Sequence, residues 1–296
     1  MDAVAFTGSA ATGRAIAAAA AERLIPCSLE LGGKNPMVVL DGADLDEAAA
    51  GLMTGAFYNC GQTCIAIERV YVEKGSYDGL VERAAARTRD LAVGWSLGWE
   101  MDVGSQVSRS HADKVSRHLE DAVAHGARLA VGGRRREDLG PAFVEPTLLT
   151  DVPPEAELAS RETFGPVVAI YRAENEDEAI EAANDTPFGL NASVWAGSRE
   201  QALEVAGRIE AGAVGVNSTL LVYHTLDVPM GGMKQSGLGR RHGRPGLLRF
   251  TQSRSIVSGP SFGGGYEALL ARTDSARKAN AIARLFRLRA RLPGLR

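Results

Sequence analysis

The sequence predicts an α/β fold built around a largely parallel sheet. Short runs rich in β-branched and apolar residues alternate with longer runs rich in alanine or charge over most of the 296 residues, and this alternation is typical of strands joined by helices. Hydrophobic residues make up 45% and charged residues 23% of the chain, the balance of an ordinary globular protein. The length suffices for one large or two ordinary domains with a buried core.

Residues 1–33 predict a strand, a helix and a second strand. The letters VAFT at 4–7 indicate the end of a short buried strand, which Gly8 follows. An Ala-rich run at 11–24 predicts a helix that Pro26 ends. CSLELGG then predicts a short strand that ends in paired glycines.

The middle of the chain continues this alternation. A strand is predicted at 36–40, and a helix at about 44–58 with Asp44 as its N-cap. IERVYVE, with its β-branched and aromatic residues, predicts the next strand. Further helices are predicted at 77–92, 111–129, 175–185 and 198–210, and further strands at 143–152, 166–173 and 192–197.

Charge and composition argue against several classes of protein. The net charge of −3 gives no general attraction to nucleic acid, so no nucleic-acid partner is expected. No stretch has the length and purity of a transmembrane helix, and the start MDAVAFTGSAATGR lacks the basic and apolar regions of a signal peptide. Three cysteines do not make a disulfide framework. We therefore expect a cytoplasmic protein without a membrane partner.

Residues 259–296 differ in character from the rest of the chain. A linker rich in Gly, Ser and Pro leads into an Arg-rich segment, which from Arg272 onward carries one acidic residue, Asp274. Two interpretations are open: a solvated, partly ordered extension, or a helix that binds a membrane surface or a partner.

FYNCGQTCIAIERV, residues 57–70, holds two of the three cysteines, Cys60 and Cys64. A structural zinc site normally needs four ligands, and no grouped histidines accompany this pair, so no metal site is expected. The spacing also differs from the CxxC of a dithiol redox centre. Cys64 follows a glycine-containing turn where a helix gives way to a strand, and such a thiol is either a nucleophile or a core residue.

Two glutamates accompany this cysteine. Glu30 ends an apolar strand in LELGGK, where burial would raise its pKa and suit it to act as a base; a surface glutamate at a strand end is the alternative. Glu162 lies in ETFGPVV, in a loop just before a strand. FTGSAATG places Gly8 and Gly13 at a strand–helix turn, a geometry suited to dinucleotide phosphates, although it is not GxGxxG.

Together these motifs resemble those of the aldehyde dehydrogenase superfamily. FTGS, LELGGKNP, NCGQTC, ETFGPV, NDTPFGLNASVW, VGVN and PMGGMKQSGLGR occur in the family's order and at its spacings over residues 1 to about 258. The resemblance implies an aldehyde dehydrogenase-like α/β fold with a partial Rossmann-like cofactor domain and an α/β catalytic domain. The implied ranges are 1–33 for the remnant of the cofactor domain, 34–230 for the catalytic domain, 231–258 for a return to the cofactor domain and the oligomerisation segment, and 259–296 for the basic extension.

The resemblance implies the oxidation of an aldehyde to a carboxylic acid. Cys64 would form a thiohemiacetal with the aldehyde, hydride transfer would leave a thioester, and Glu30 would activate the water that hydrolyses it. The backbone N–H of Cys64 would donate to the developing alkoxide. Asn59 would shape the nucleophile turn, and Cys60 and Cys27 would be small core residues.

The resemblance also implies NADP or NAD as cofactor and a small-molecule aldehyde as substrate. Glu162 would hold the ribose hydroxyls on the nicotinamide side, with Phe164 and the backbone at Leu31 near the ring. Gly8 and Ser9 would lie along the cofactor phosphates and ribose.

The sequence departs from the family's pattern at several points. In the family, a cofactor-domain segment with an oxyanion-hole asparagine precedes FTGS, so we expect an N-terminally truncated chain that lacks NAD(P)-dependent activity alone; an aldehyde assay tests this. Arg161 stands where an acid is common, and Arg241 where glutamate is usual. CIAIERVYV and GGMKQSGLGRRHG look more like the NADP-dependent succinate-semialdehyde dehydrogenase branch. A carboxylate-bearing substrate would call for an arginine near Cys64.

Two other functions are open: a catalytically silent fragment that acts only by oligomer assembly, and a thiol esterase. The family's chains associate through C-terminal strands, to which residues 240–258 correspond, so a homo-oligomer is expected. Unpaired sheet edges would favour such assembly. Cys64 and Glu30 would cleave activated esters without a cofactor, which a Cys64→Ser variant tests.

Overall fold

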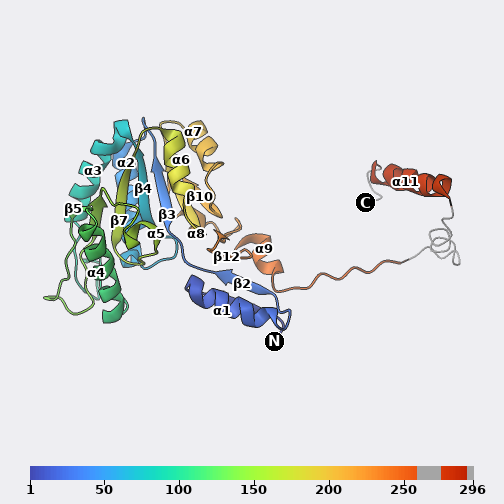
Figure 1. Ribbon diagram of the computed structural model, residues 1–296, viewed down its shortest axis with the longest axis horizontal. Helices are drawn as coiled ribbons and strands as arrows, with labels where there is room; N and C mark the ends of the chain where they lie inside the picture. The colour runs from blue at the N-terminus through green and yellow to red at the C-terminus, as the bar shows by residue number, and fades with distance from the viewer. Residues whose placement is uncertain (259–274, 292–296) are drawn as a thin grey trace. The chain divides into compact units, whose positions relative to one another are not determined.

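The computed structural model describes residues 1–258 and 275–291 of the chain, and Figure 1 labels its elements. The chain divides into two compact units, Met1–Gln252 and Ser253–Arg296. In the second unit, helix α11 spans Ala276–Arg291, within the Arg-rich segment of the extension. The linker that precedes this segment lies outside the described residues.

A seven-stranded sheet forms the core of the first unit (Figure 1). Its strand order is β10-β9-β3-β4-β7-β6-β5, and every neighbouring pair is parallel except β5 and β6. The strands are β3 (Asn35–Val39), β4 (Ile67–Glu73), β5 (Arg128–Val131), β6 (Thr147–Thr150), β7 (Val167–Ala173), β9 (Asn191–Trp195) and β10 (Ala213–Val216). The prediction of a largely parallel sheet is confirmed.

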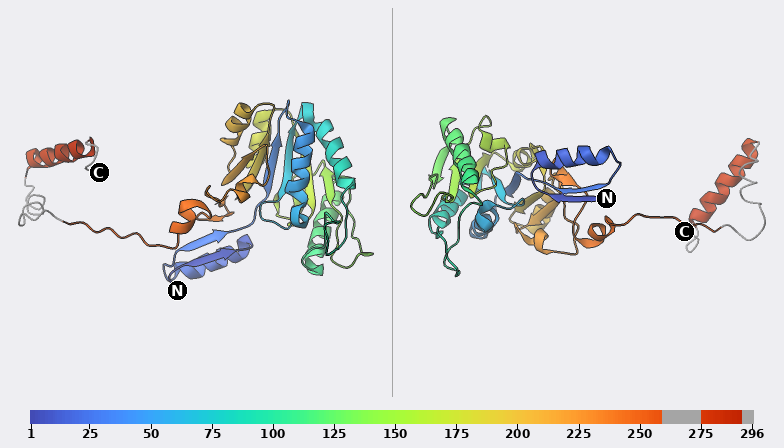
Figure 2. Two further views of the ribbon diagram at one scale, coloured as in Figure 1. Left: turned by 180° about the vertical axis from the view of Figure 1, so that it is seen from behind. Right: turned by 90° about the horizontal axis from the view of Figure 1, so that it is seen from below.

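Helices cover both faces of this sheet (Figures 1 and 2). They are α2 (Leu45–Phe57) and α3 (Lys74–Arg89) on one face, and α4 (Arg109–Ala124), α6 (Glu176–Asn184) and α7 (Arg199–Ala206) on the other. In β3, Met37 and Val39 join the core under α2 and α3, whereas Val38, together with Leu40 just after the strand, joins the core under α6 and α7. A strand buried on both faces needs a continuous apolar run, and this is why PMVVL lacks the alternation of a half-exposed strand.

A smaller sheet lies beside the N-terminal helix (Figure 2). Its order is β1-β2-β12, with β1 and β2 parallel and β12 antiparallel to β2. The elements are β1 (Val4–Thr7), α1 (Ala10–Ala21), β2 (Cys27–Glu30) and β12 (Gly237–Leu238). A separate antiparallel pair joins β8 (Phe188–Gly189) to β11 (Met233–Lys234), which directly precedes β12 in the chain. Because β2 ends at Glu30 and β3 begins at Asn35, the chain passes from one sheet to the other within a few residues.

Most predicted elements are present, with boundaries that differ by a few residues. Asp44 caps α2 as predicted, because its carboxylate accepts the N–H groups of Asp46 and Glu47 at 3.0 and 3.1 Å. The predicted strand at 143–152 is shorter and occupies Thr147–Thr150. Short helical segments complete the unit at Tyr58–Gly61 (3₁₀), Glu157–Ser160 (α5), Leu221–His224 (α8) and Gly243–Leu248 (α9).

Candidate active site

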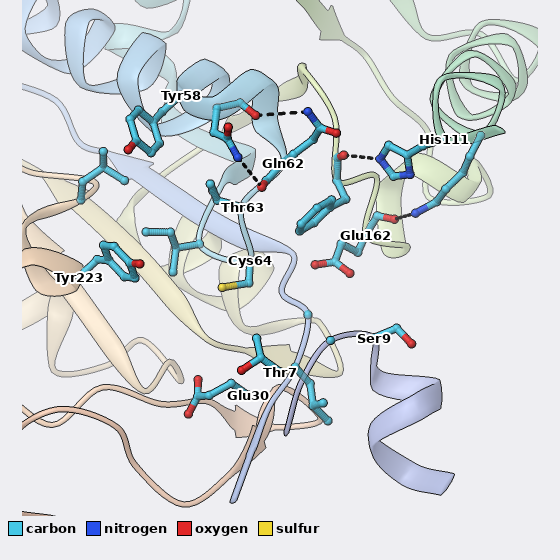
Figure 3. Close-up of a pocket in the computed structure, with 18 of the residues that line it drawn as sticks. Thr7, Ser9, Glu30, Tyr58, Gln62, Thr63, Cys64, His111, Glu162 and Tyr223 are labelled. Atoms are coloured by element: carbon cyan, nitrogen blue, oxygen red, sulfur yellow. Dashed lines mark hydrogen bonds between the residues drawn. The ribbon is translucent and has the colours of Figure 1, made fainter. Parts of the chain in front are cut away.

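One pocket of about 760 Å³ gathers the residues that the sequence singles out (Figure 3). Its walls come from the β1–α1 turn, the end of β2, the loop before β4, the start of α4, the loop before β7, and α8. The sequence-predicted residues that line it are Gly8, Ser9, Glu30, Leu31, Asn59, Cys64, Glu162 and Phe164. Segments far apart in the chain therefore meet around a single cavity.

The turn before Cys64 has an unusual backbone. Asn59, Cys60 and Gly61 all adopt left-handed conformations, with φ of 49°, 60° and 69°. A Cβ at Gly61 would lie 2.1 Å from the carbonyl oxygen of Gly165, so glycine is required there. The Asn59 side chain closes the turn, because its Nδ2 donates to the Gln62 carbonyl at 3.0 Å.

Cys60 lies beyond the end of helix α2. Helix α2 ends at Phe57, and Cys60 is half-buried in the following turn. Its Sγ accepts the N–H of Gly104 at 3.1 Å and packs against the core under α2. Burial raises the pKa of the Cys60 thiol, which suits a structural residue.

Two buried asparagines hold the nucleophile loop, and sequence reasoning assigned neither a role. Asn35 donates through Nδ2 to the carbonyls of Cys64 and Ala66, at 2.9 and 2.7 Å. Asn191 donates through Nδ2 to the Ile65 carbonyl at 3.2 Å, and its own N–H donates to Asn35 at 3.0 Å. Each asparagine is the first residue of an apolar strand, and this position could have identified them in the sequence, because a buried amide needs hydrogen-bond partners.

The environment of Cys64 keeps its thiol protonated at neutral pH. Burial, followed by the charges of Glu30 and Glu162, raises the pKa of Cys64 to about 11. The backbone N–H groups of Cys64 and Ile65 act in the opposite direction. A base or a positive charge in the pocket is therefore needed to form the thiolate that attacks.

Glu30 is buried at the end of β2 and lines the same pocket as Cys64 (Figure 3). It pairs with Thr7 on β1 and with Gly237 on β12. Burial raises the pKa of Glu30, as predicted, and nearby arginines, with Arg241 first, partly oppose this effect. The Arg241 Nε lies 3.7 Å from Glu30 Oε1.

Glu162 presents a second carboxylate to the pocket (Figure 3). Its Oε1 accepts the N–H of Gly33 at 3.0 Å, and a Cβ at Gly32 would lie 2.3 Å from the other oxygen. Burial and the charge of Glu68 raise the pKa of Glu162 to about 6. Glycine at position 32 is thus what lets this carboxylate approach the backbone.

A buried ion pair holds the N–H side of the loop that carries Glu162. Glu68 accepts the N–H groups of Thr163 and Phe164 at 2.9–3.1 Å. Its charge is balanced by Lys34, whose Nζ lies 2.5 Å away, and both side chains are at most 3% exposed. The pair was not singled out from the sequence, although two adjacent charges opening the apolar strand IERVYV were a signal.

Helix α4 holds the carbonyl side of the same loop. Lys114 Nζ donates to the carbonyls of Glu162 and Thr163 at 2.9 and 3.2 Å. The His111 Nε2 lies 2.6 Å from the Phe164 carbonyl oxygen (Figure 3). Because Phe164 has a left-handed φ of 58°, these contacts stabilise a backbone conformation that phenylalanine rarely adopts.

The β1–α1 side of the pocket has features that suit a nucleotide. Helix α1 begins just after Ser9, which caps it by accepting the Thr12 N–H at 3.2 Å. Gly8 and Ser9 line the pocket at this helix N-terminus, where backbone N–H groups and the helix dipole favour phosphate. The Glu162 carboxylate can accept hydrogen bonds from ribose hydroxyl groups. Together with the helix N-terminus, it therefore fits a dinucleotide cofactor.

Two kinds of feature are absent from the described residues. No group of three or more His, Cys, Asp or Glu side chains within 1–258 and 275–291 is arranged to hold a metal ion. Over the same residues, no helix has the length and apolar character needed to cross a membrane.

The fold and this pocket define an α/β protein with a cysteine in its pocket and, on one wall, a helix N-terminus suited to bind a nucleotide. The chain belongs to the aldehyde dehydrogenase family, because residues 1–256 match the description "Aldehyde dehydrogenase family". It is 48% identical over 258 residues to the protein of Mycobacterium bovis (strain BCG / Pasteur 1173P2) named "Putative succinate-semialdehyde dehydrogenase [NADP(+)] 2", covering 87% of this chain and 50% of that protein. The chain thus spans about half the length of the curated relatives it matches.

Solved structures agree with this assignment. The NAD-dependent aldehyde dehydrogenase of Sinorhizobium meliloti superposes with a TM-score of 0.83 and 38% identity, over 88% of this chain and 53% of that one. Betaine aldehyde dehydrogenase of Staphylococcus aureus in complex with NAD+ gives a TM-score of 0.80 and 35% identity, over 84% and 50%. The expectation of an aldehyde dehydrogenase-like fold is confirmed.

Proposed function

We propose that this chain is the catalytic portion of an aldehyde dehydrogenase that oxidises a small aldehyde to a carboxylic acid with NAD(P)+. The observation that carries the proposal is the meeting of Cys64, Glu30 and Glu162 in one pocket, each from a different segment. Family membership supports the same reaction class. A silent fragment that acts only by assembly would have no need of these three side chains around one cavity.

The proposed reaction divides the work between two side chains. The Cys64 thiol gives its proton to a base in the pocket, and the thiolate adds to the aldehyde carbon to form a thiohemiacetal. Loss of a hydride from that carbon, to the cofactor described below, would give a thioester on Cys64. Glu30 takes a proton from water, which attacks the thioester carbonyl and releases the carboxylic acid and the Cys64 sulfur. The backbone N–H groups of Cys64 and Ile65, which act to lower the pKa of the Cys64 thiol, would donate to the developing negative charge.

The cofactor in this proposal is NADP or NAD. When bound, its oxidised nicotinamide supplies the hydride acceptor. Glu162 would accept the ribose hydroxyls, Phe164 and Leu31 would border the ring, and Gly8 and Ser9 would face the phosphates and ribose. The name of the M. bovis relative favours NADP.

Succinate semialdehyde is the proposed substrate, on the strength of that same name. The arginine expected near Cys64 does not occur among the described residues that line the pocket. The cationic or titratable nitrogen groups there are Lys114, His111 and His224. Lys114 and His111 already contact the Glu162 loop, so His224 is the available partner for a substrate carboxylate.

We also propose a homo-oligomer in the cytoplasm. Free thiols at all three cysteines fit a reducing compartment. Three large apolar side chains of the segment 240–258 are exposed in the first unit, namely Leu247, Leu248 and Phe250, and such surfaces are typical of association sites.

An activated ester tests the thiol chemistry without a cofactor. The purified chain is mixed with p-nitrophenyl acetate, and nitrophenolate release is followed for wild type, Cys64→Ala and Cys60→Ala. We expect release by wild type and Cys60→Ala, and only the solvent rate with Cys64→Ala. Equal rates in all three proteins would contradict the assignment of Cys64 as nucleophile. Reduction of NAD+ or NADP+ with succinate semialdehyde, in the same variants, tests the complete reaction.

A further inference from the structure

Glu30 carries a buried oxygen without a hydrogen bond. The side chain is about 6% exposed, and its Oε1 has no hydrogen-bond partner among the described residues. The nearest cation is the Arg241 guanidinium, whose Nε lies 3.7 Å from this oxygen. At this distance the two charged groups attract each other as an ion pair. The distance is longer than that of an N–H···O hydrogen bond, which is about 2.9 Å.

Arg241 is fixed in place by contacts other than Glu30. Its main chain bridges to Met230, whose N–H donates to the Arg241 carbonyl at 2.9 Å. Its Nη2 donates to the Phe6 carbonyl at 3.2 Å. Arg241 Nε itself is buried and has no acceptor within the part of the chain that the structure describes. The unpaired donor, Arg241 Nε, and the unpaired acceptor, Glu30 Oε1, therefore lie near each other because the surrounding backbone fixes the arginine.

The strand pairing explains how these two residues meet. Strand β12 runs antiparallel to β2 and sets Gly237 opposite Glu30, so the turn that follows β12 carries Arg241 back toward the carboxylate. Gly231 leaves room for the group, since a Cβ there would lie 3.1 Å from Glu30 Oε1. The approach is a product of register rather than of a flexible surface side chain.

Other charged groups around Glu30 are committed elsewhere or lie across the pocket. Arg240 donates from Nη1 to the carbonyls of Gly232 and Gly239, and Arg249 donates from Nη1 to Ser28 at 3.0 Å. Both lower the pKa of Glu30 less than Arg241 does. The Cys64 thiol and the Glu162 carboxylate line the same pocket.

We propose that Arg241 is a positioning residue for Glu30, which keeps the carboxylate charged through an ion pair without occupying its lone pairs in hydrogen bonds. A fully hydrogen-bonded arginine would occupy the lone pairs that a general base uses. With no cation nearby, burial would favour the neutral acid, which cannot take a proton. The inference rests on the proposed function of Glu30, and it assigns Arg241 the task of holding the base in its working state.

The test is a titration of Glu30 in the chain as it stands. Glutamate labelled with ¹³C at the side-chain carboxyl is incorporated, and the Glu30 signal is identified by its loss in Glu30→Gln. Its pKa is then measured in wild type, Arg241→Met, Arg241→Lys and Arg240→Met. We expect an upward shift of the Glu30 pKa in Arg241→Met, a value near wild type in Arg241→Lys, and a smaller upward shift in Arg240→Met.

An unchanged pKa of Glu30 in Arg241→Met, or equal shifts in Arg241→Met and Arg240→Met, would overturn the proposal. If Arg241→Met does not fold, Arg241→Gln replaces it and is judged by the same criteria.

A second measurement separates this inference from the proposed function. The rate of hydrolysis of the acetyl group from Cys64 is followed against pH in the same proteins. We expect the acid limb of the profile in Arg241→Met to move upward with the titration of Glu30, with losses at low pH that approach those of Glu30→Gln, about 10²–10⁴-fold. Normal hydrolysis in Glu30→Gln would refute the general-base role, and the positioning role with it. Slow hydrolysis in Glu30→Gln with an unmoved profile in Arg241→Met would refute the role of Arg241 alone.

Discussion

Two glutamates, Glu68 and Glu30, are buried near the same pocket with opposite surroundings. The Glu68 carboxylate accepts two backbone N–H groups and lies 2.5 Å from Lys34. The Glu30 carboxylate keeps an oxygen without a hydrogen bond, and its nearest cation lies at 3.7 Å. The comparison teaches that a carboxylate with every partner in place acts as structure, whereas one with an unused lone pair is available for chemistry.

Replacing Glu30 is expected to have the largest effect, and the quantity affected is the rate of thioester hydrolysis. Glu30→Gln removes the proposed base without changing shape, so hydrolysis of the acetyl thioester should slow by about 10²–10⁴-fold. Stability should fall less than in Glu68→Gln, because the Arg241 side chain that loses its ion-pair partner is 21% exposed, whereas Lys34 is 1% exposed. Rapid-mixing kinetics with p-nitrophenyl acetate and urea unfolding measure the two quantities.

Replacing Glu68 is expected to affect stability instead. Glu68→Gln leaves the Lys34 charge buried without its partner, a loss of about 3–5 kcal/mol in the free energy of unfolding. The double variant Lys34→Met/Glu68→Gln should recover part of this loss, because no unpaired charge remains. Urea unfolding of the three proteins checks the order, and a single variant as stable as wild type would break the comparison.

The charge of Glu68 also reaches Glu162, which gives a smaller, pH-dependent effect. The folded state raises the pKa of Glu162 from 4.5 to about 6, so the folded protein binds this proton more tightly than the unfolded chain. The contribution of Glu162 to stability is therefore present below about pH 4.5 and lost as the pH rises through about 6, by at most about 2 kcal/mol. Unfolding of wild type and Glu162→Gln at a series of pH values measures the difference, and parallel curves for the two proteins would contradict it.

Glu30 should influence Cys64 in the same manner. Carboxylate charge is one of the causes that raise the pKa of Cys64 to about 11, so Glu30→Gln should lower it and increase the thiolate fraction at neutral pH. Alkylation of Cys64 by iodoacetamide should then be faster in Glu30→Gln than in wild type below about pH 11. An alkylation rate that is the same in both proteins at every pH would show that the charge of Glu30 does not contribute to the pKa of Cys64.

The sequence predicts the fold class and the principal side chains of the pocket, but few of the contacts that hold them. The alternation of apolar runs predicts the parallel sheet, and the motifs around Cys64, Glu30 and Glu162 identify residues that line one cavity. The partners of Glu68 escape such reasoning, because the N–H groups it binds lie 95 and 96 positions later in the chain. Only the pairing of β4 with β7 brings them together.

Arg241 illustrates the same limit. Its departure from the family pattern is visible in the sequence, whereas its proximity to Glu30 depends on the antiparallel register of β12 against β2. Asn35 and Asn191 are likewise visible as polar residues in apolar strands, but their shared hold on the nucleophile loop requires β3 and β9 to be neighbours. Local pattern identifies the residue type, and long-range register decides its partner.

The most direct test of the central claim is to locate the acyl group that accumulates when the base is missing. Glu30→Gln is mixed with p-nitrophenyl acetate, quenched in acid, digested, and analysed by mass spectrometry. We predict one acetylated cysteine, on the peptide that contains Cys64, at higher occupancy than in wild type. Acetyl groups spread over Cys27, Cys60 and Cys64, or no excess over wild type, would contradict the division of labour between Cys64 and Glu30.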